Sequence, residues 1–175
     1  MSQLIRMVYV STTTNPVQQK LGTIQVDVGR ILMQARKNNP TRKIGGVLYF
    51  SNDYFFQCLE GEQEAVNHLY QKILQDPRHK NVQAIKIQHI DERLFNNWSM
   101  KYVIQEDDLS EILADNGFTE FNPYQFDDRV IDSILDFFAE ARDLTGGSDQ
   151  DYGNARRRQD KPGLLSRLFK RSQAA

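Results

Sequence analysis

Apolar and polar positions repeat along the chain with two different periods, and the period changes from segment to segment. Alternation with β-branched residues predicts strands, and apolar residues at i, i+3, i+4 and i+7 predict amphipathic helices. The chain carries five segments of the first kind and two of the second, in the order β-α-β-β-α-β-β. In chain order these segments are residues 3–11, 23–38, 44–51, 54–60, 62–76, 82–90 and 98–104.

Turn residues mark the boundaries between these segments. Pro40 follows the first helix and disfavours helical geometry in the residue before it. Asn52-Asp53 separates two strands and predicts a tight β-hairpin. Pro77 follows the second helix. Four of the strands and both helices form the split-βαβ pattern, so we predict an α+β, ferredoxin-like fold with two helices on one face of the sheet.

Two further helical segments follow the last strand. Residues 108–116 end at Gly117, a residue that commonly terminates helices. Residues 127–143 carry an apolar stripe, and we expect these helices to cover the second face of the sheet. Beyond them, residues 146–162 have almost no apolar content and are predicted to be disordered. The predicted organisation is a domain at 1–104, a helical cap at 105–145, and a basic tail at 146–175 whose last residues suit a short amphipathic helix.

Composition narrows the class of protein. The 39% of hydrophobic and 26% of charged residues are ordinary for a soluble globular domain. No apolar run reaches the roughly 18 residues of a membrane span, and no signal peptide is recognised, so we expect a cytoplasmic protein. The residues from 145 onward include seven basic and three acidic side chains, although the whole chain has a net charge of −1. This tail is either a solvated end or a contact for a partner, an anionic membrane surface or nucleic acid.

Motifs for common enzyme chemistry are absent. The sequence has no glycine-rich phosphate loop, no CxxC and no HExxH, and its histidines have no metal-site spacing, so we predict neither a metal site nor an enzyme. The single cysteine, Cys58, excludes an internal disulfide. Because alternation places Cys58 on the face opposite Gln57, with no evident base, we interpret it as an inert buried thiol.

Polar residues at apolar positions are the candidates for function. Tyr9 lies inside the first strand, and Gln57 lies inside the third strand in FFQCLEGE. Taken singly, they fit a core tyrosine bonded to the backbone and a glutamine satisfied at a sheet edge. Asn38-Asn39 likewise fits an ordinary helix end. None of these residues identifies a function alone.

Taken together, the same residues resemble one family. The chain resembles the BLUF domain, the blue-light sensor that uses FAD, in LIRMVYVS with its Tyr9, in ARKNNP, in GGVLYFSNDYFFQCLEGE, and in DPRHKNV followed by WSM. The resemblance extends over residues 3–104, and residues 105–144 are similar to the two C-terminal helices of short, stand-alone members.

The resemblance implies a noncovalently bound FAD whose ring lies between the two helices and against the central strands. The implied cofactor contacts are Ile31 and Ile73 on either side of the ring, Asn38, Asn39 and Gln57 at its polar edge, and Lys72, Asp76, Arg78 and His79 beside the ribityl and phosphate groups. The implied photoactive residues are Tyr9, Gln57, Trp98 and Met100.

The residue types suit this chemistry. A phenol can release an electron and a proton together, and a carboxamide carries an acceptor and a donor on one head, so it can reverse a hydrogen bond in place. We therefore predict a photoreceptor in which strand 98–104 and the C-terminal helices change binding to a downstream protein, such as a transcriptional regulator, or change the oligomeric state. The alternative is a ferredoxin-like interaction or small-ligand regulatory domain without photochemistry.

Overall fold

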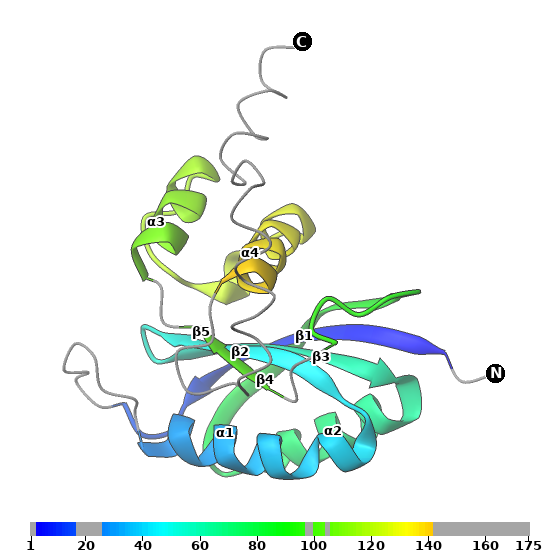
Figure 1. The fold of residues 1–175 in the computed structure, drawn as a ribbon. Helices are drawn as coiled ribbons and strands as arrows, with labels where there is room; N and C mark the ends of the chain where they lie inside the picture. The colour runs from blue at the N-terminus through cyan, green and yellow to red at the C-terminus, as the bar shows by residue number, and fades with distance from the viewer. Residues whose placement is uncertain (1–2, 17–25, 97–99, 104–105, 142–175) are drawn as a thin grey trace. The chain divides into compact units, whose positions relative to one another are not determined.

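The fold is built on a five-stranded sheet with the strand order β4-β1-β3-β2-β5 (Figure 1). The computed structural model describes residues 3–16, 26–96, 100–103 and 106–141. The strands are β1 (Leu4–Thr13), β2 (Gly45–Ser51), β3 (Tyr54–Glu62), β4 (His79–His89) and β5 (Lys101–Val103). All neighbouring strands pair antiparallel except β2 and β5, which are parallel. The predicted α+β, ferredoxin-like fold is confirmed.

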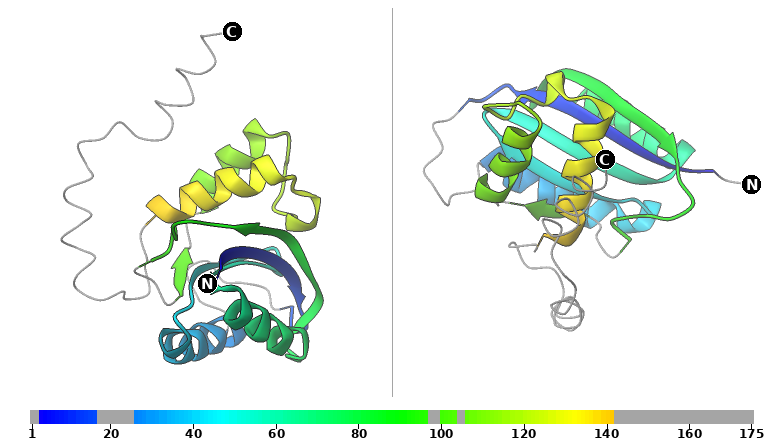
Figure 2. Two further views of the ribbon diagram at one scale, coloured as in Figure 1. Left: turned by 90° about the vertical axis from the view of Figure 1, so that its right-hand side faces the viewer. Right: turned by 90° about the horizontal axis from the view of Figure 1, so that it is seen from above.

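Helices cover both faces of this sheet (Figures 1 and 2). The helices are α1 (Val26–Asn38), α2 (Gln63–Leu74), α3 (Glu106–Asp115) and α4 (Asp128–Glu140), with short 3-10 turns η1 (Pro40–Arg42) and η2 (Pro123–Gln125). Figure 2 shows α1 and α2 on one side of the sheet, and α3 and α4 on the other. The two-sided arrangement expected from the sequence is therefore present.

Strand alternation divides the core into two clusters, one on each face. Tyr9 of β1 packs in the cluster that contains residues of α1 and α2. Val8 and Cys58 belong to the other cluster, with the apolar residues of α3 and α4. Cys58 is fully buried there and burial raises the pKa of its thiol, in agreement with its interpretation as an unreactive core residue.

Two local features hold β2 and β3 in register. Asn52 and Asp53 have φ angles of 50° and 65°, the left-handed pair that a two-residue hairpin turn requires. Gly46 lies so close to the backbone of β3 that a Cβ atom built on it would be 2.0 Å from the carbonyl oxygen of Cys58. The pairing of Leu48 with Gln57 thus rests on a turn and a glycine that the sequence displays.

Strand ends differ from the sequence-based prediction in several places. Met100, predicted to lie inside the last strand, comes just before β5. β1 continues to Thr13 rather than ending at residue 11, and β4 begins at His79 rather than at residue 82. The two extensions depend on one another, because Thr13 pairs with His79 across the β1–β4 ladder after two irregularities in register. Bulges of this kind let a ladder continue past residues that are out of phase, which simple alternation does not anticipate.

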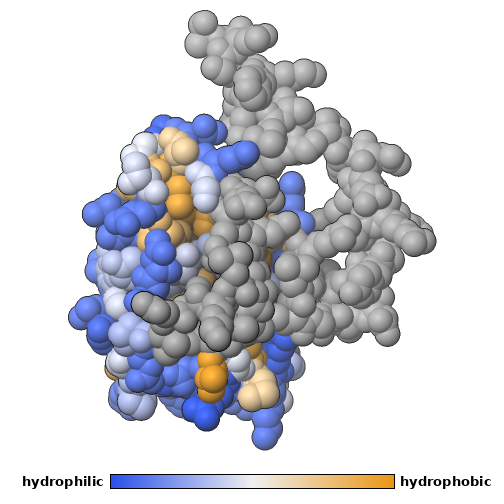
Figure 3. Space-filling model, turned by 90° about the vertical axis from the view of Figure 1, so that its left-hand side faces the viewer, coloured by the Kyte–Doolittle hydropathy of each residue, from blue (hydrophilic) through white to orange (hydrophobic). Residues whose placement is uncertain are grey.

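The C-terminal helices have recognisable ends. Gly117 has a φ of 82°, and the amide of Phe118 donates to the Leu113 carbonyl at 2.9 Å, as in a glycine-terminated helix. Asp127, which we expected to open the last helix, caps it instead: its side chain accepts from the Val130 amide at 2.9 Å. Figure 3 shows hydrophobic residues gathered toward the upper part of one face, bordered by hydrophilic ones.

Several sequence-based expectations concern residues outside the described ranges. These are the first turn of the helix at 23–38, Trp98, the end of the cap domain and the basic tail at 146–175. Within the described ranges, no helix combines the length and the apolar character needed to cross a membrane.

Candidate functional site

A cavity of about 260 Å³ opens between α1 and α2 and reaches the central strands of the sheet. Ile31 and Ala35 of α1 line one wall, and Leu69 and Ile73 of α2 line another. These apolar positions are spaced by four residues on each helix, so each pair lies on one helical face. The remaining lining residues are Tyr9, Gln34, Asn38, Asn39, Arg42, Gln57, Lys72, Asp76, Arg78 and His79.

Tyr9 and Gln57 form a buried polar pair at the sheet side of the cavity. They are direct partners in the antiparallel β1–β3 ladder, and both side chains are almost completely buried. The Tyr9 hydroxyl donates to Oε1 of Gln57. Nε2 of Gln57 donates to Sδ of Met100, which lies just before β5, at 3.3 Å. A single carboxamide therefore connects β1 with the start of β5.

Burial determines the protonation state of the tyrosine. Desolvation raises the pKa of Tyr9 far above its usual range, and the nearby Asp76 acts in the same direction. The phenol is therefore neutral and can serve as a hydrogen-bond donor at any physiological pH. This state matches the donor role that the contact with Gln57 requires.

Asn38 and Asn39 lie where α1 ends and border the same cavity. Asn39 is buried, and its backbone is fixed by a bond from its amide to the Ala35 carbonyl and one from the Ile44 amide to its own carbonyl. Asn38 is half-buried, and its carbonyl accepts from the Thr41 hydroxyl at 2.8 Å. The tight turn through η1 thus presents two carboxamides at one side of the cavity.

Charged residues gather at the end of the cavity near the start of β4. Nε of Arg78 donates to Oδ1 of Asp76 at 2.8 Å, and this hydrogen bond holds the pKa of the Asp76 carboxyl below its usual value. Nη2 of Arg78 also donates to Oε1 of Gln34 at 2.9 Å, which links this corner to α1. Lys72 lies on α2 beside them.

His79 is a neutral, buried member of this corner. Its Nδ1 is 2.8 Å from the Ser11 hydroxyl, and its ring packs against Phe55 at a centroid distance of 4.6 Å. Burial lowers the pKa of His79 to about 4, and the nearby Arg78 adds to this effect. The imidazole therefore carries no charge near neutral pH.

The structure brings together nearly all of the residues singled out from the sequence. Met100 does not line the cavity but contacts it through Gln57, and Trp98 falls outside the described residues. Sequence reasoning missed Gln34, Ala35, Leu69 and Arg42. Helical spacing from Ile31 and Ile73 was a signal for the first three of these. Arg42 follows the asparagines after a proline turn and had no such signal.

The chemistry of the cavity fits a flavin. Its aliphatic walls suit the faces of a flat aromatic ring, and its buried amides suit the carbonyl and imide edge. The volume of about 260 Å³ is slightly below the roughly 300–1,000 Å³ of typical ligand pockets, so it suits the flavin ring rather than the whole dinucleotide. Lys72 and Arg78 suit the phosphate groups as cationic partners. No group of three or more metal-ligating side chains occurs in the described ranges.

Comparison with known proteins agrees with this geometry. Residues 4–101 match the family model described as BLUF, sensors of blue-light using FAD. Among solved structures, the ground state of BlsA has a TM-score of 0.73 and 34% identity, and the match covers 81% of this chain and 91% of that one. The photo-activated state of BlsA has the same TM-score and identity, with 82% of this chain and 99% of that chain covered.

Two curated relatives are much longer than the matched region. The photoactivated adenylate cyclase subunit beta of Euglena gracilis is 32% identical over 104 residues, which are 59% of this chain and 11% of the relative. The blue light- and temperature-regulated antirepressor BluF of Escherichia coli K12 is 31% identical over 107 residues, 59% of this chain and 26% of the relative. Because the family model matches more than half of its residues, this chain belongs to the BLUF family of blue-light sensors that use FAD.

Proposed function

We propose that Tyr9 and Gln57 convert the absorption of blue light by FAD in the α1–α2 cavity into a changed hydrogen bond to Met100. The observation that supports this proposal most strongly is the continuous chain from the Tyr9 hydroxyl through the Gln57 carboxamide to the Met100 sulfur. This series of hydrogen bonds starts at the cavity and ends beside the edge strand β5.

Tyr9 supplies the electron and the proton in this proposal. Bound FAD supplies the light absorption and the electron acceptor. Because the Tyr9 hydroxyl is neutral and already donates to Gln57, its proton has a fixed acceptor when the phenol loses an electron. The raised pKa means that no phenolate is available beforehand, so the electron leaves a neutral phenol and the proton leaves with it or after it.

Gln57 acts as the switch because its two ends have opposite hydrogen-bonding character. Its oxygen now faces Tyr9 and its nitrogen faces Met100. If the amide rotates by half a turn, the oxygen faces the thioether sulfur, which accepts but cannot donate. The hydrogen bond to Met100 is then lost, and Nε2 becomes available on the other side.

The size of the output follows from these hydrogen bonds. One hydrogen bond contributes about 0.5–1.5 kcal/mol net, which changes an equilibrium by up to about tenfold. A change from 1:99 to 99:1 requires about 5.5 kcal/mol. We therefore expect a partial shift of population in β5 and the C-terminal helices, rather than a complete transition.

A change of binding is the proposed output. The E. coli relative BluF is described as an antirepressor. By analogy we propose that the cap helices contact a protein such as a transcriptional regulator, or a second copy of this chain. In this division of the chain, 1–104 senses light, 105–145 transmits the change, and 146–175 takes no part in the photochemistry. Deletion of residues 146–175 should leave the spectral response intact.

Absorption spectroscopy tests the proposal. Purified protein with FAD should show a reversible red shift of its flavin bands under blue light. Gln57→Leu should bind FAD and lose the shift, whereas Cys58→Ala, one residue away on the opposite face, should retain it. A colourless protein that does not bind FAD would favour the alternative without photochemistry, and a full shift in Gln57→Leu would remove Gln57 from the mechanism.

A further inference from the structure

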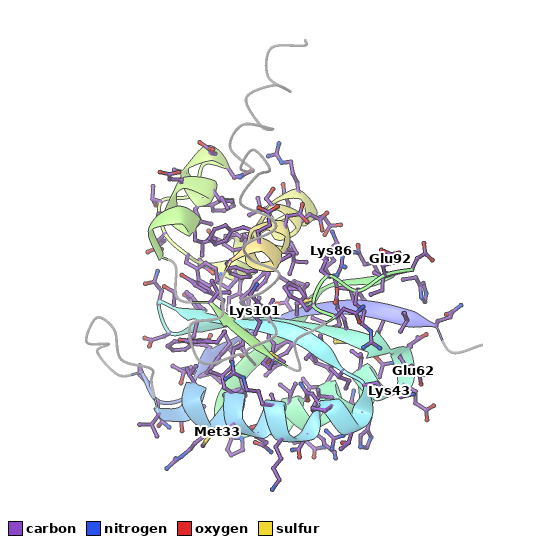
Figure 4. All side chains as sticks on the ribbon, viewed as in Figure 1. Met33, Lys43, Glu62, Lys86, Glu92 and Lys101 are labelled. Carbon is purple, nitrogen blue, oxygen red and sulfur yellow. The ribbon has the colours of Figure 1, made fainter. Side chains whose placement is uncertain are left out.

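Two lysines connect α4 to opposite edges of the sheet (Figure 4). Lys86 of β4 lies 2.6 Å from Oδ1 of Asp132, in the N-terminal half of α4. Lys101 of β5 donates from Nζ to the carbonyl oxygen of Ala139, in the last turn of α4, at 3.1 Å. Because β4 and β5 are the two edge strands, α4 extends across the sheet and is attached near both of its ends.

Lys101 is an unusual lysine because it is only 1% exposed. Lysine is rarely buried completely, since removing an ammonium group from water is costly unless a partner compensates. The last carbonyl groups of a helix lack partners within the helix, and the C-terminus carries partial negative charge. At Ala139, the buried ammonium group of Lys101 gains an acceptor, and a carbonyl group at the end of α4 gains a donor. At the other edge of the sheet, the side chain of Lys86 is 8% exposed, and its ammonium group pairs with an Asp132 side chain that is 53% exposed.

The backbone of β5 connects Lys101 to the proposed switch. Met100 precedes Lys101 and belongs to the core cluster on the cavity side. Lys101 pairs with Val47, whose side chain belongs to the cluster with α4, so adjacent residues of this segment reach opposite faces of the sheet. Met100 is itself held from the cavity side by Gln57 and, through its carbonyl, by Nε of Arg36 at 3.0 Å.

We infer that Lys101 is the positioning residue that transmits the state of Gln57 to the C-terminal turn of α4. This inference rests on the proposed Tyr9–Gln57 switch. When the Gln57 amide ceases to donate to Met100, the segment 100–103 is held less firmly on the cavity side, and Lys101 moves the Ala139 end of α4 with it. The other end of α4, attached at Lys86, stays in place.

Hydrogen exchange in light and dark on the FAD-bound full chain tests this inference. In the native protein, illumination should change exchange in the last turn of α4 more than in the turn near Asp132. Lys101→Met keeps the length of the side chain but removes the charge, so it should keep the red shift and lose most of the light-dependent exchange in α4. Lys101→Arg should restore that difference. Lys86→Met is the matched control and should preserve it.

Different outcomes test the role of Lys101 and the proposed Tyr9–Gln57 switch. The role of Lys101 would be overturned if Lys101→Met kept the light-dependent difference in exchange. It would also be overturned if Lys86→Met lost this difference to the same extent as Lys101→Met. If illumination of the native protein changed exchange mainly near Asp132, the role of Lys101 would also be overturned. This measurement on the native protein tests the inference even if Lys101→Met fails to fold. A native protein with no red shift would instead contradict the proposed function.

Discussion

Replacement of Glu60 by glutamine should lower the free energy of unfolding by about 3–5 kcal/mol, the usual loss when one partner of a buried charge pair is removed. Glu60 is fully buried at the end of β3. Its Oε1 accepts from Nε of Arg6 at 2.6 Å and from the Leu94 amide at 3.2 Å, and its Oε2 accepts from the Phe95 amide at 2.9 Å. One carboxylate thus joins β1 to the segment that follows β4.

The magnitude follows from these contacts. A hydrogen bond to a charged group contributes about 1.5–3 kcal/mol, and Glu60 makes several. The Glu60→Gln variant has nearly the same shape, but its NH₂ group cannot accept a hydrogen bond and leaves at least one donor without a partner. The side chain of Arg6 is only 11% exposed, so its charge would remain largely buried and uncompensated.

Urea denaturation at a fixed excess of FAD measures this loss. Glu62→Gln is the matched control, because Glu62 is exposed two residues further along and its replacement should change stability by no more than about 0.5 kcal/mol. A double-mutant cycle with Arg6→Gln should give a coupling energy of about 1–3 kcal/mol. If the free energy of unfolding of Glu60→Gln lies within about 1 kcal/mol of that of the native protein, the Glu60 carboxylate does not hold this region.

Three further predictions follow from buried groups. Gly46→Ala should lower the free energy of unfolding by about 1–3 kcal/mol in the same assay, because the new methyl group overlaps the Cys58 carbonyl. An unchanged urea midpoint would contradict the close spacing of β2 and β3 at this position. Because the pKa of folded His79 is about 4, below its unfolded value, stability should fall as the pH drops from about 6.5 to about 4. His79→Gln should make stability less dependent on pH between about 6.5 and about 4. If the variant and the native protein lose stability equally over this range, His79 is not the group responsible. The Cys58 thiol should react with a thiol reagent only at the rate of unfolding, and rapid labelling of native protein would exclude its burial.

The sequence was sufficient for those features that depend on local periodicity. Alternation alone placed Tyr9 and Gln57 within their strands, and the Asn52-Asp53 turn brought the neighbouring strand into register. Helical spacing placed Ile31 and Ile73 on faces that could meet across a cavity. The grouping of these residues into one site came from the resemblance to a family.

Features that depend on packing between distant segments had no local signal. Lys101 occupies a strand position that alternation assigns to the core, where lysine is not expected. Its partner is a backbone carbonyl in α4, which carries no sequence information. Glu60 likewise satisfies two backbone amides beyond β4, so its type and spacing did not distinguish it from an exposed strand residue.

The absorption difference between light and dark in Tyr9→Phe tests the central claim most directly. This substitution removes only the hydroxyl group that donates to Gln57 in the wall of the cavity. The native protein should show a reversible red shift of its flavin bands under blue light. Tyr9→Phe should bind FAD with an ordinary dark spectrum and show no such shift. A red shift of native size in Tyr9→Phe would contradict the claim that Tyr9 and Gln57 sense light.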